Sequence, residues 1–254
     1  MFSIKTLPAF KDNYIYLFCS EEDKKAAVID PGDSSIVLSF LRKEKYNLSD
    51  ILVTHHHLDH IGGIIDLKKE TGACVYGPNN KYIEGLDIFL SNQTIKILNE
   101  QIIVFRTPGH TLDHICYYLP KRNILFSGDT LFSFGCGRLF EGSAAQMWKS
   151  LKTLRKLPKK TKVYSAHEYT LKNLLFACSL EPKNKALHDI YTQFSKKQLP
   201  LVPTTLFQEK RFNPFFKCDD KFFIKSIEKY RGKDFSANKT LNVFSYIRKL
   251  KNDF

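Results

Sequence analysis

The 254-residue sequence lacks any apolar run of about 18 residues, the length that a membrane-spanning helix needs. Its first residues lack the basic start, long apolar core and small-residue cleavage site of a secretory signal peptide. Its six cysteines are scattered without a C-x-x-C pair, a pattern that excludes a disulfide scaffold in a chain of this length. These absences lead us to expect a cytoplasmic protein with no membrane partner.

Acidic residues are the scarcer charged class, because 26 Asp and Glu stand against 39 Lys and Arg, for a net charge of +13. Such a bias can serve a nucleic acid or an anionic small substrate. The basic residues are dispersed among apolar ones, and no nucleic-acid-binding motif is present. We therefore interpret most of them as a solvated surface and expect no nucleic-acid partner.

Strand-like and helix-like patterns alternate over the first two thirds of the chain, which is typical of an α/β protein. The strands are expected as two within 1–20, then at 26–29, 51–54, 74–76, 94–98, 102–106, 115–119, 124–126 and 162–165. The helices are expected after a cap at Asp33 or Ser34, over 61–70, from the capping box at Ser143 to Pro158, and then over 171–180, 186–198, 221–230 and 240–250. Because strand signals fade after residue 168, we expect an α/β domain over 1–167 and a helical domain over 168–254.

A cluster of histidines directly follows the apolar strand 51–53. Side chains alternate along an extended segment, so His55, His57 and Asp59 can point one way, with His60 following as the chain turns. Imidazole and carboxylate groups together suit zinc or another first-row metal. The cluster is not an expression tag, because tags are terminal and lack the flanking strand and the aspartate.

Three further candidate ligands, His110, Asp129 and His167, each follow an expected strand and open a loop. Their repeated placement makes convergence at one sheet edge the natural expectation. Seven ligands are too many for one tetrahedral zinc and suit two metals that share a carboxylate. Two metals roughly 3.5–4 Å apart hold a bridging hydroxide, which predicts hydrolysis without a protein nucleophile. Cys136 is accordingly interpreted as a small buried residue.

The pattern T-H-H-H-x-D-H-x-G-G, with the later His, Asp and His, resembles the metallo-β-lactamase superfamily. Further segments narrow the resemblance to the glyoxalase II, or hydroxyacylglutathione hydrolase, family. These segments are 10–14, 128–132, 135–142, 167–170, 213–215 and 248–254. The resemblance implies an αββα sandwich followed by a helical substrate-binding domain. It also implies hydrolysis of S-D-lactoylglutathione and related S-(2-hydroxyacyl)glutathione thioesters to glutathione and D-lactate, the second step of methylglyoxal detoxification.

The resemblance also assigns the site residues. It puts one metal on His55, His57 and His110, and a second on Asp59, His60 and His167, with Asp129 bridging. Asp59 and Asp129 are then the catalytic carboxylates beside the metal-bridging hydroxide. The two divalent ions are expected to be zinc, with iron or manganese as alternatives, because His and Asp ligands accept all three.

The same resemblance places glutathione, which carries two carboxylates, against basic and aromatic side chains. These side chains are Arg138, Phe140, Tyr169, Arg248 and Lys251. Some members of the family have Tyr where this chain has Phe140. We expect a monomer with a small-molecule thioester as its partner.

Several nearby residues fall outside this assignment. His56 and His114 are expected to be structural, and Asp30 either supports a ligand imidazole or forms a turn. His188 matches nothing in the family. Asp113 occupies a position that is often Gly, and its extra carboxylate could tune the metal site.

Other functions remain open from the sequence alone. A mononuclear-iron glutathione persulfide dioxygenase would leave Asp59 and His60 outside the metal shell and would not need the basic ending. A metal-dependent phosphodiesterase or ribonuclease of the same superfamily gains from the charge but lacks a nucleic-acid module. A β-lactamase is a further alternative. A non-enzymatic metal- or glutathione-binding protein would show no thioester turnover.

Overall fold

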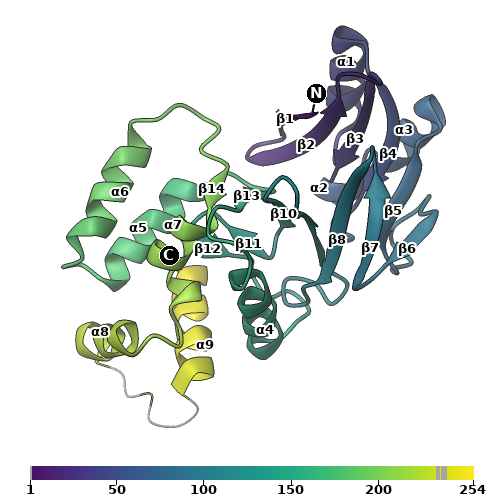
Figure 1. Cartoon of the computed structure of the whole chain (residues 1–254). Helices are drawn as coiled ribbons and strands as arrows, with labels where there is room; N and C mark the ends of the chain where they lie inside the picture. Colours follow the sequence, from purple (N-terminus) through teal and green to yellow (C-terminus); the bar gives the residue numbers. More distant parts are fainter. Residues whose placement is uncertain (1, 233–234, 236–238) are drawn as a thin grey trace.

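The computed structural model describes residues 2–232, 235 and 239–254. Two β-sheets are stacked on each other, and the C-terminal helices lie beside the end of the second sheet (Figure 1). The first sheet has the order β1 (Phe2–Ala9), β2 (Asn13–Ser20), β3 (Lys25–Ile29), β4 (Asn47–Leu52), β5 (Cys74–Pro78), β6 (Ile88–Leu90). The second has the order β14 (Thr204–Thr205), β13 (Lys162–Ser165), β10 (Ile124–Gly128), β9 (Ile115–Leu119), β8 (Glu100–Arg106), β7 (Gln93–Ile97).

The core between the sheets follows from the period-two alternation of side chains. In β2, Tyr16 and Phe18 face the second sheet, where they meet Phe126. The alternate residues Ile15 and Leu17 belong to a separate buried cluster under the outer helices. Apolar residues therefore occupy both faces of this strand, as expected for a strand covered on both sides.

Helices cover both outer faces of the sheet pair, which makes the αββα sandwich. On the first sheet lie α1 (Ser34–Glu44), α2 (Leu58–Ile61) and α3 (Ile64–Thr71). On the second lies α4 (Ala144–Arg155). The helices that follow along the chain are α5 (Thr170–Leu180), α6 (Lys185–Ser195), α7 (Leu206–Phe212), the 3-10 turn η1 (Pro214–Phe216), α8 (Lys221–Arg231) and α9 (Lys239–Asn252). In the part of the chain that the structure describes, no helix is long and apolar enough to cross a membrane.

Local caps account for several helix boundaries. Asp33 caps α1 by accepting the backbone N–H groups of Ser35 and Ile36. Ser143 and Gln146 form the expected capping box at the start of α4. Both predictions are confirmed.

The expected helix over 61–70 is two helices, α2 and α3, with two glycines between them. A Cβ on Gly62 would lie 2.7 Å from Gly32 O, and one on Gly63 would lie 2.5 Å from Pro31 O. The start of α3 packs directly on this turn, and Gly63 N donates to Pro31 O at 2.8 Å. The helix that matches most of the prediction, α3, therefore begins at Ile64 instead of residue 61. It follows a glycine turn in which a Cβ would clash with the neighbouring backbone.

The C-terminal region is mainly helical, as expected, but it is not purely so. Its two-residue strand β14 pairs antiparallel with β13 and extends the second sheet. The sequence analysis also missed β6, α7, η1 and the hairpin of β11 (Leu131–Phe132) and β12 (Gly135–Cys136). The helix expected over 186–198 ends at Ser195.

Candidate metal centre and substrate pocket

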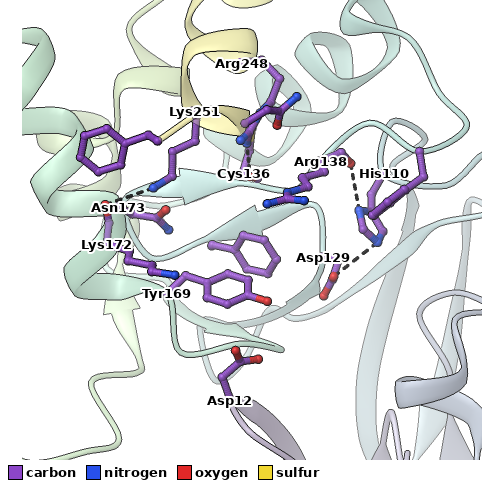
Figure 2. A pocket seen from close by; sticks show the side chains of 14 residues that line it. Asp12, His110, Asp129, Cys136, Arg138, Tyr169, Lys172, Asn173, Arg248 and Lys251 are labelled. Atoms are coloured by element: carbon purple, nitrogen blue, oxygen red, sulfur yellow. Dashed lines mark hydrogen bonds and ion pairs between the residues drawn. The ribbon is translucent and has the colours of Figure 1, made fainter.

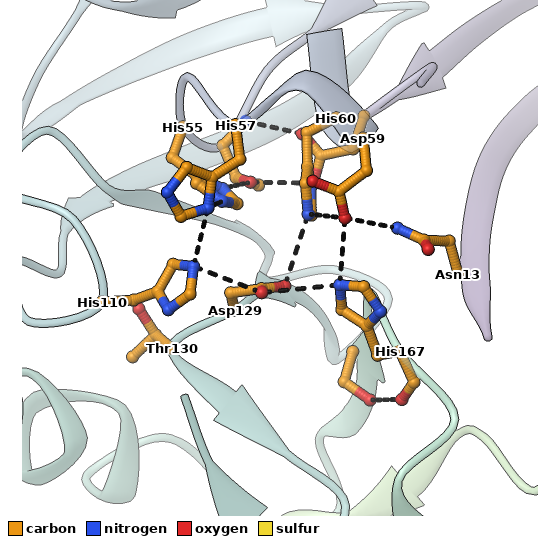
Figure 3. Close-up of polar contacts among 12 residues, drawn as sticks. Asn13, His55, His57, Asp59, His60, His110, Asp129, Thr130 and His167 are labelled. Atoms are coloured by element: carbon orange, nitrogen blue, oxygen red, sulfur yellow. Dashed lines mark hydrogen bonds and ion pairs between the residues drawn. The ribbon is translucent and has the colours of Figure 1, made fainter. Parts of the chain in front are cut away.

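Loops that follow strands of both sheets meet at one end of the sandwich. The chain leaves β4 into the segment with His55, His57, Asp59 and His60. Figure 3 shows these four residues converging with the other three predicted ligands, His110, Asp129 and His167. An isolated bridge between Asn13 and His167 joins the two sheets at this edge.

Three imidazoles form the first donor group. His57 Nδ1 lies 3.0 Å from His55 Nε2 and 3.0 Å from His110 Nε2. Two nitrogens on one tetrahedral zinc at about 2.0–2.1 Å lie roughly 3.3 Å apart, so this spacing is close to that of a shared cation. Burial lowers the pKa of each of these three histidines. Neutral imidazoles with free lone pairs are the form that binds a metal.

Asp129 lies between this group and a second one. Its Oδ2 lies 3.3 Å from His110 Nε2 and 3.5 Å from His167 Nε2, and its Oδ1 lies 3.5 Å from His60 Nε2. Asp59 Oδ2 lies 3.5 Å from both His60 Nε2 and His167 Nε2. The structure thus brings all seven predicted ligands together, with Asp129 in the central position.

The charges of this cluster fit cations. Burial alone would raise the pKa of Asp129, but His167 and His60 hold it far below its ordinary range. Burial likewise opposes the charged form of His167, yet Asp129, Asp12 and Asp59 raise its pKa to about 9. His60 Nε2 and Asp129 Oδ1 have no hydrogen-bond partner among the described residues. Buried polar atoms are normally paired, so these donors indicate divalent metal binding.

Four of the imidazoles, those of His55, His60, His110 and His167, also contact a polar group through their Nδ1 atom. Such a contact orients a metal ligand. His55 Nδ1 meets Thr54 Oγ1 at 3.0 Å, and His110 Nδ1 meets Arg138 O at 2.9 Å. His167 Nδ1 lies 2.8 Å from Asp12 Oδ1.

The Asp30 side chain contacts the predicted ligand His60, and its backbone carbonyl accepts Gly32 N at 2.9 Å in the turn. Its Oδ2 lies 3.0 Å from His60 Nδ1, and its carboxylate accepts Thr54 N at 2.7 Å and Thr54 Oγ1 at 2.8 Å. Asn13, which the sequence analysis did not single out, donates to Asp59 Oδ2 at 2.8 Å.

The remaining histidines are not among the seven donors, although the ring of His114 stacks on that of His55 with 4.9 Å between the centroids. His114 accepts the backbone N–H of Asp129 at 3.0 Å, which fixes the loop rather than a metal. His56 faces Asp113 and Glu141. His188, which lies on α6, contacts Pro182 O. Cys136 is buried, and burial raises the pKa of its thiol to about 11, as a structural cysteine requires.

A pocket of about 400 Å³ opens beside His110 and Asp129 (Figure 2). All five predicted substrate contacts line it, together with residues that the sequence analysis missed. The predicted residues are Arg138, Phe140, Tyr169, Arg248 and Lys251, and the missed ones include Asp12, Phe132, Lys172 and Asn173. Lys172 and Asn173 follow Tyr169 by three and four residues on α5, so helical spacing was the available signal.

Aromatic side chains line the end of the pocket near the candidate metal donors, and cations line its other end. Tyr169 stacks on His167 at 5.1 Å between ring centroids, and Phe140 packs edge-on against His57 and His110. Burial and neighbouring cations lower the pKa of Lys251 to about 8, and its Nζ donates to Lys172 O at 3.1 Å.

Arg248 differs from a freely exposed anchor. It is buried, and its Nη1 donates to Cys136 O at 2.6 Å and to Gly137 O at 3.3 Å. It therefore supports the backbone that leads to Arg138 while also lining the pocket.

Comparison with known proteins assigns the two parts of the chain. Residues 10–167 match the family described as Metallo-beta-lactamase superfamily, and residues 168–254 match Hydroxyacylglutathione hydrolase C-terminus. Hydroxyacylglutathione hydrolases from Pseudomonas aeruginosa strain LESB58 and Psychromonas ingrahamii are 43% and 41% identical to this chain, each over the full length of both proteins.

Solved structures agree with this assignment. ETHE1 from Myxococcus xanthus is 25% identical with a TM-score of 0.68, and it covers 98% of this chain and 90% of its own. BLEG-1 B3 metallo-beta-lactamase is 26% identical with a TM-score of 0.66, and it covers 84% of this chain and 99% of its own. The chain belongs to the hydroxyacylglutathione hydrolase family of the metallo-β-lactamase superfamily.

Proposed function

We propose that this chain hydrolyses S-D-lactoylglutathione and related S-(2-hydroxyacyl)glutathione thioesters to glutathione and a 2-hydroxy acid. The observation that carries the proposal is the cationic pocket directly beside seven metal donors. A doubly carboxylated peptide thioester matches both features, because its carboxylates suit the cations and its acyl group reaches the metals. The family relationship supports the same substrate. The reaction would complete methylglyoxal detoxification.

The proposed metal assignment uses two divalent ions per chain. His55, His57 and His110 would hold the first, and Asp59, His60 and His167 the second, with Asp129 shared. Two groups with donor atoms within 4.8 Å of one another, His55, His57, His110 and Asp59, His60, His167, support this division, and a third group, His55, His60 and Asp129, joins the two. Zinc suits the nitrogen and oxygen donors, as do iron and manganese. When bound, such ions ionise water near neutral pH and polarise a thioester carbonyl.

The residues of the chain prepare this chemistry by holding their groups in place. The Asp59 and Asp129 carboxylates are the proposed catalytic groups, and the bond from Asn13 orients Asp59. Tyr169 and Phe140 would bind the central part of the substrate and exclude water from the reacting end. Arg138 and Lys251 would bind its carboxylates, and Arg248 would hold the supporting backbone.

One chain would be the complete functional unit. Residues 1–167 would supply the metal ligands, and both parts would line the pocket, with Tyr169, Arg248 and Lys251 coming from 168–254. No second chain is needed to complete this arrangement, which supports a monomer. All six cysteines are free, and this supports a reducing, cytoplasmic setting.

The test measures hydrolysis of S-D-lactoylglutathione by purified protein, with metal content quantified in the same sample. Rapid turnover with about two metals per chain is expected, as binuclear hydrolysis requires. Asp129→Ala should lose turnover, whereas Asp23→Ala, which removes an exposed carboxylate elsewhere, should retain it. No turnover with two bound metals would refute the thioesterase. One bound iron with oxygen uptake on glutathione persulfide would favour the dioxygenase instead.

A further inference from the structure

A polar network beside the candidate metal donors joins four segments of the chain. Its members, called here the His56 network, are His56, Asn80, Thr111, Asp113 and Glu141. His56 lies between two metal-ligand candidates in sequence, and its ring contacts that of His57, but both of its nitrogens face carboxylates. Its Nδ1 lies 3.1 Å from both oxygens of Asp113, and its Nε2 lies 3.2 Å from Glu141 Oε1.

Asp113 fixes the position of the His56 ring. Its Oδ1 accepts the Thr111 hydroxyl at 2.5 Å, and its Oδ2 accepts Asn80 Nδ2 at 2.8 Å. The side chains of His56 and Asp113 are 14% and 9% exposed, so solvent screens their interaction less than that of a surface pair. A glycine at position 113 could make none of these contacts.

Glu141 connects the same ring to the segment that carries two substrate-pocket residues. We call residues 137–142 the substrate loop, because it contains Arg138 and Phe140. Glu141 Oε2 accepts the backbone N–H of Leu112 at 2.8 Å, while Oε1 faces His56. The Glu141 carboxylate therefore links the substrate loop to the segments that carry Leu112 and His56.

The substrate loop also contacts the His110 segment, and through His110, whose Nε2 lies 3.0 Å from His57 Nδ1, it reaches the His55–His60 segment indirectly. Phe140 N donates to His110 O at 3.1 Å, and His110 Nδ1 meets Arg138 O at 2.9 Å. The interaction of Glu141 with His56 adds a direct polar contact between the substrate loop and the His55–His60 segment. Displacement of the loop would move Arg138 and Phe140 relative to the metal donors.

We propose that His56 is a positioning residue, which holds the substrate loop over the metal donors through Glu141 and is itself fixed by Asp113. The substrate in this inference rests on the proposed function, whereas the contacts that hold the loop do not depend on it. The three side chains also have the spacing of a metal-binding group. Their polar atoms already pair with one another and with the loops, and this pairing favours a structural bridge.

The chain offers variants that separate the two sides of the His56 ring. His56→Asn keeps an amide near Asp113 but cannot reach Glu141, whereas His56→Gln can extend an amide toward Glu141. Glu141→Gln removes the charge at the other end of the bridge. Glu22→Gln is the matched control, because Glu22 is exposed and distant in the fold.

The first measurement is backbone hydrogen exchange of the substrate loop, which needs no substrate. Exchange should accelerate in His56→Asn and Glu141→Gln and stay at the parent rate in Glu22→Gln and His56→Gln. The double variant should exchange no faster than either single variant, since both remove the same contact. Unchanged exchange in both single variants, or additive acceleration in the double variant, would overturn the bridge.

The second measurement is steady-state hydrolysis of S-D-lactoylglutathione with metal content on the same samples. The two bridge-breaking variants should raise KM about fivefold to tenfold and keep kcat within about twofold, because they affect substrate positioning. Metal content should equal the parent value. Loss of metal would assign the network to metal retention and contradict the proposal. If the parent itself shows no turnover, the proposed function fails, while hydrogen exchange still decides the bridge.

Discussion

Lys251 provides a test of substrate recognition through pH. It lies on α9 at the pocket, where burial lowers the pKa of its ammonium to about 8. The nearby cations Arg248, Lys172 and Arg138 act in the same direction. The side chain is therefore charged below this value and neutral above it, and it loses its attraction for a substrate carboxylate as the pH rises.

The pKa gives the size of the effect. The charged fraction of Lys251 falls from about 0.9 at about pH 7 to about 0.1 at about pH 9. Because kcat/KM reports ionisations of the free enzyme, it should fall by up to about tenfold over this range. Lys251→Arg should flatten the profile, since Arg remains charged throughout. Lys251→Met should give a low value that changes little with pH.

The assay is hydrolysis of S-D-lactoylglutathione at constant ionic strength, because salt screens charged contacts. The comparison of Lys251 with Arg at the same position isolates this residue from ionisations of the substrate and the metal site. A flat parent profile would refute the reasoning. So would an equal fall in Lys251→Arg, because the titrating group would then lie elsewhere.

Three other substitutions test supporting residues. Asp30→Asn removes the charge facing His60 and should weaken metal affinity about 10–100-fold in a chelator titration, whereas unchanged affinity would contradict this role. Burial raises the pKa of Glu209 to about 7, so its stabilisation is present below its ordinary value of 4.5 and is lost as pH rises through 7. Glu209→Gln, which resembles the neutral acid, should flatten this pH dependence in denaturant unfolding, and an unaltered slope would count against it. Lys172→Gln should raise KM and reduce its salt dependence, and identical salt slopes would exclude Lys172 as an anchor.

The candidate metal donors could be predicted from the sequence because each signal is local. An apolar strand predicts its own burial, and a polar residue at its end predicts a loop at the sheet edge. His110, Asp129 and His167 all follow this rule, and the structure brings them together. Distance in sequence did not obscure the site, because His110, Asp129 and His167 each follow a strand of their own and the other four candidates follow β4 together.

The support of the pocket was harder to predict because it depends on contacts between distant residues. The charge of Arg248 indicated an anion, yet its Nη1 donates to carbonyls more than a hundred residues away. Strands β11, β12 and β14 are two residues long, too short for periodicity to appear. The capping box of Thr205 and Gln208 was an available signal for α7, which the sequence-based prediction missed.

The small strand β14 has a consequence for how the chain folds during synthesis. The last metal-ligand candidate, His167, leaves the ribosome well before Thr204 and Thr205, which cover the neighbouring strand β13. Until those residues emerge, β13 is an exposed sheet edge, which can pair with other chains. A fragment that stops at residue 167 would retain this exposed edge permanently. The pairing of β14 with Lys162 and Val163 therefore closes part of this sheet edge to other chains.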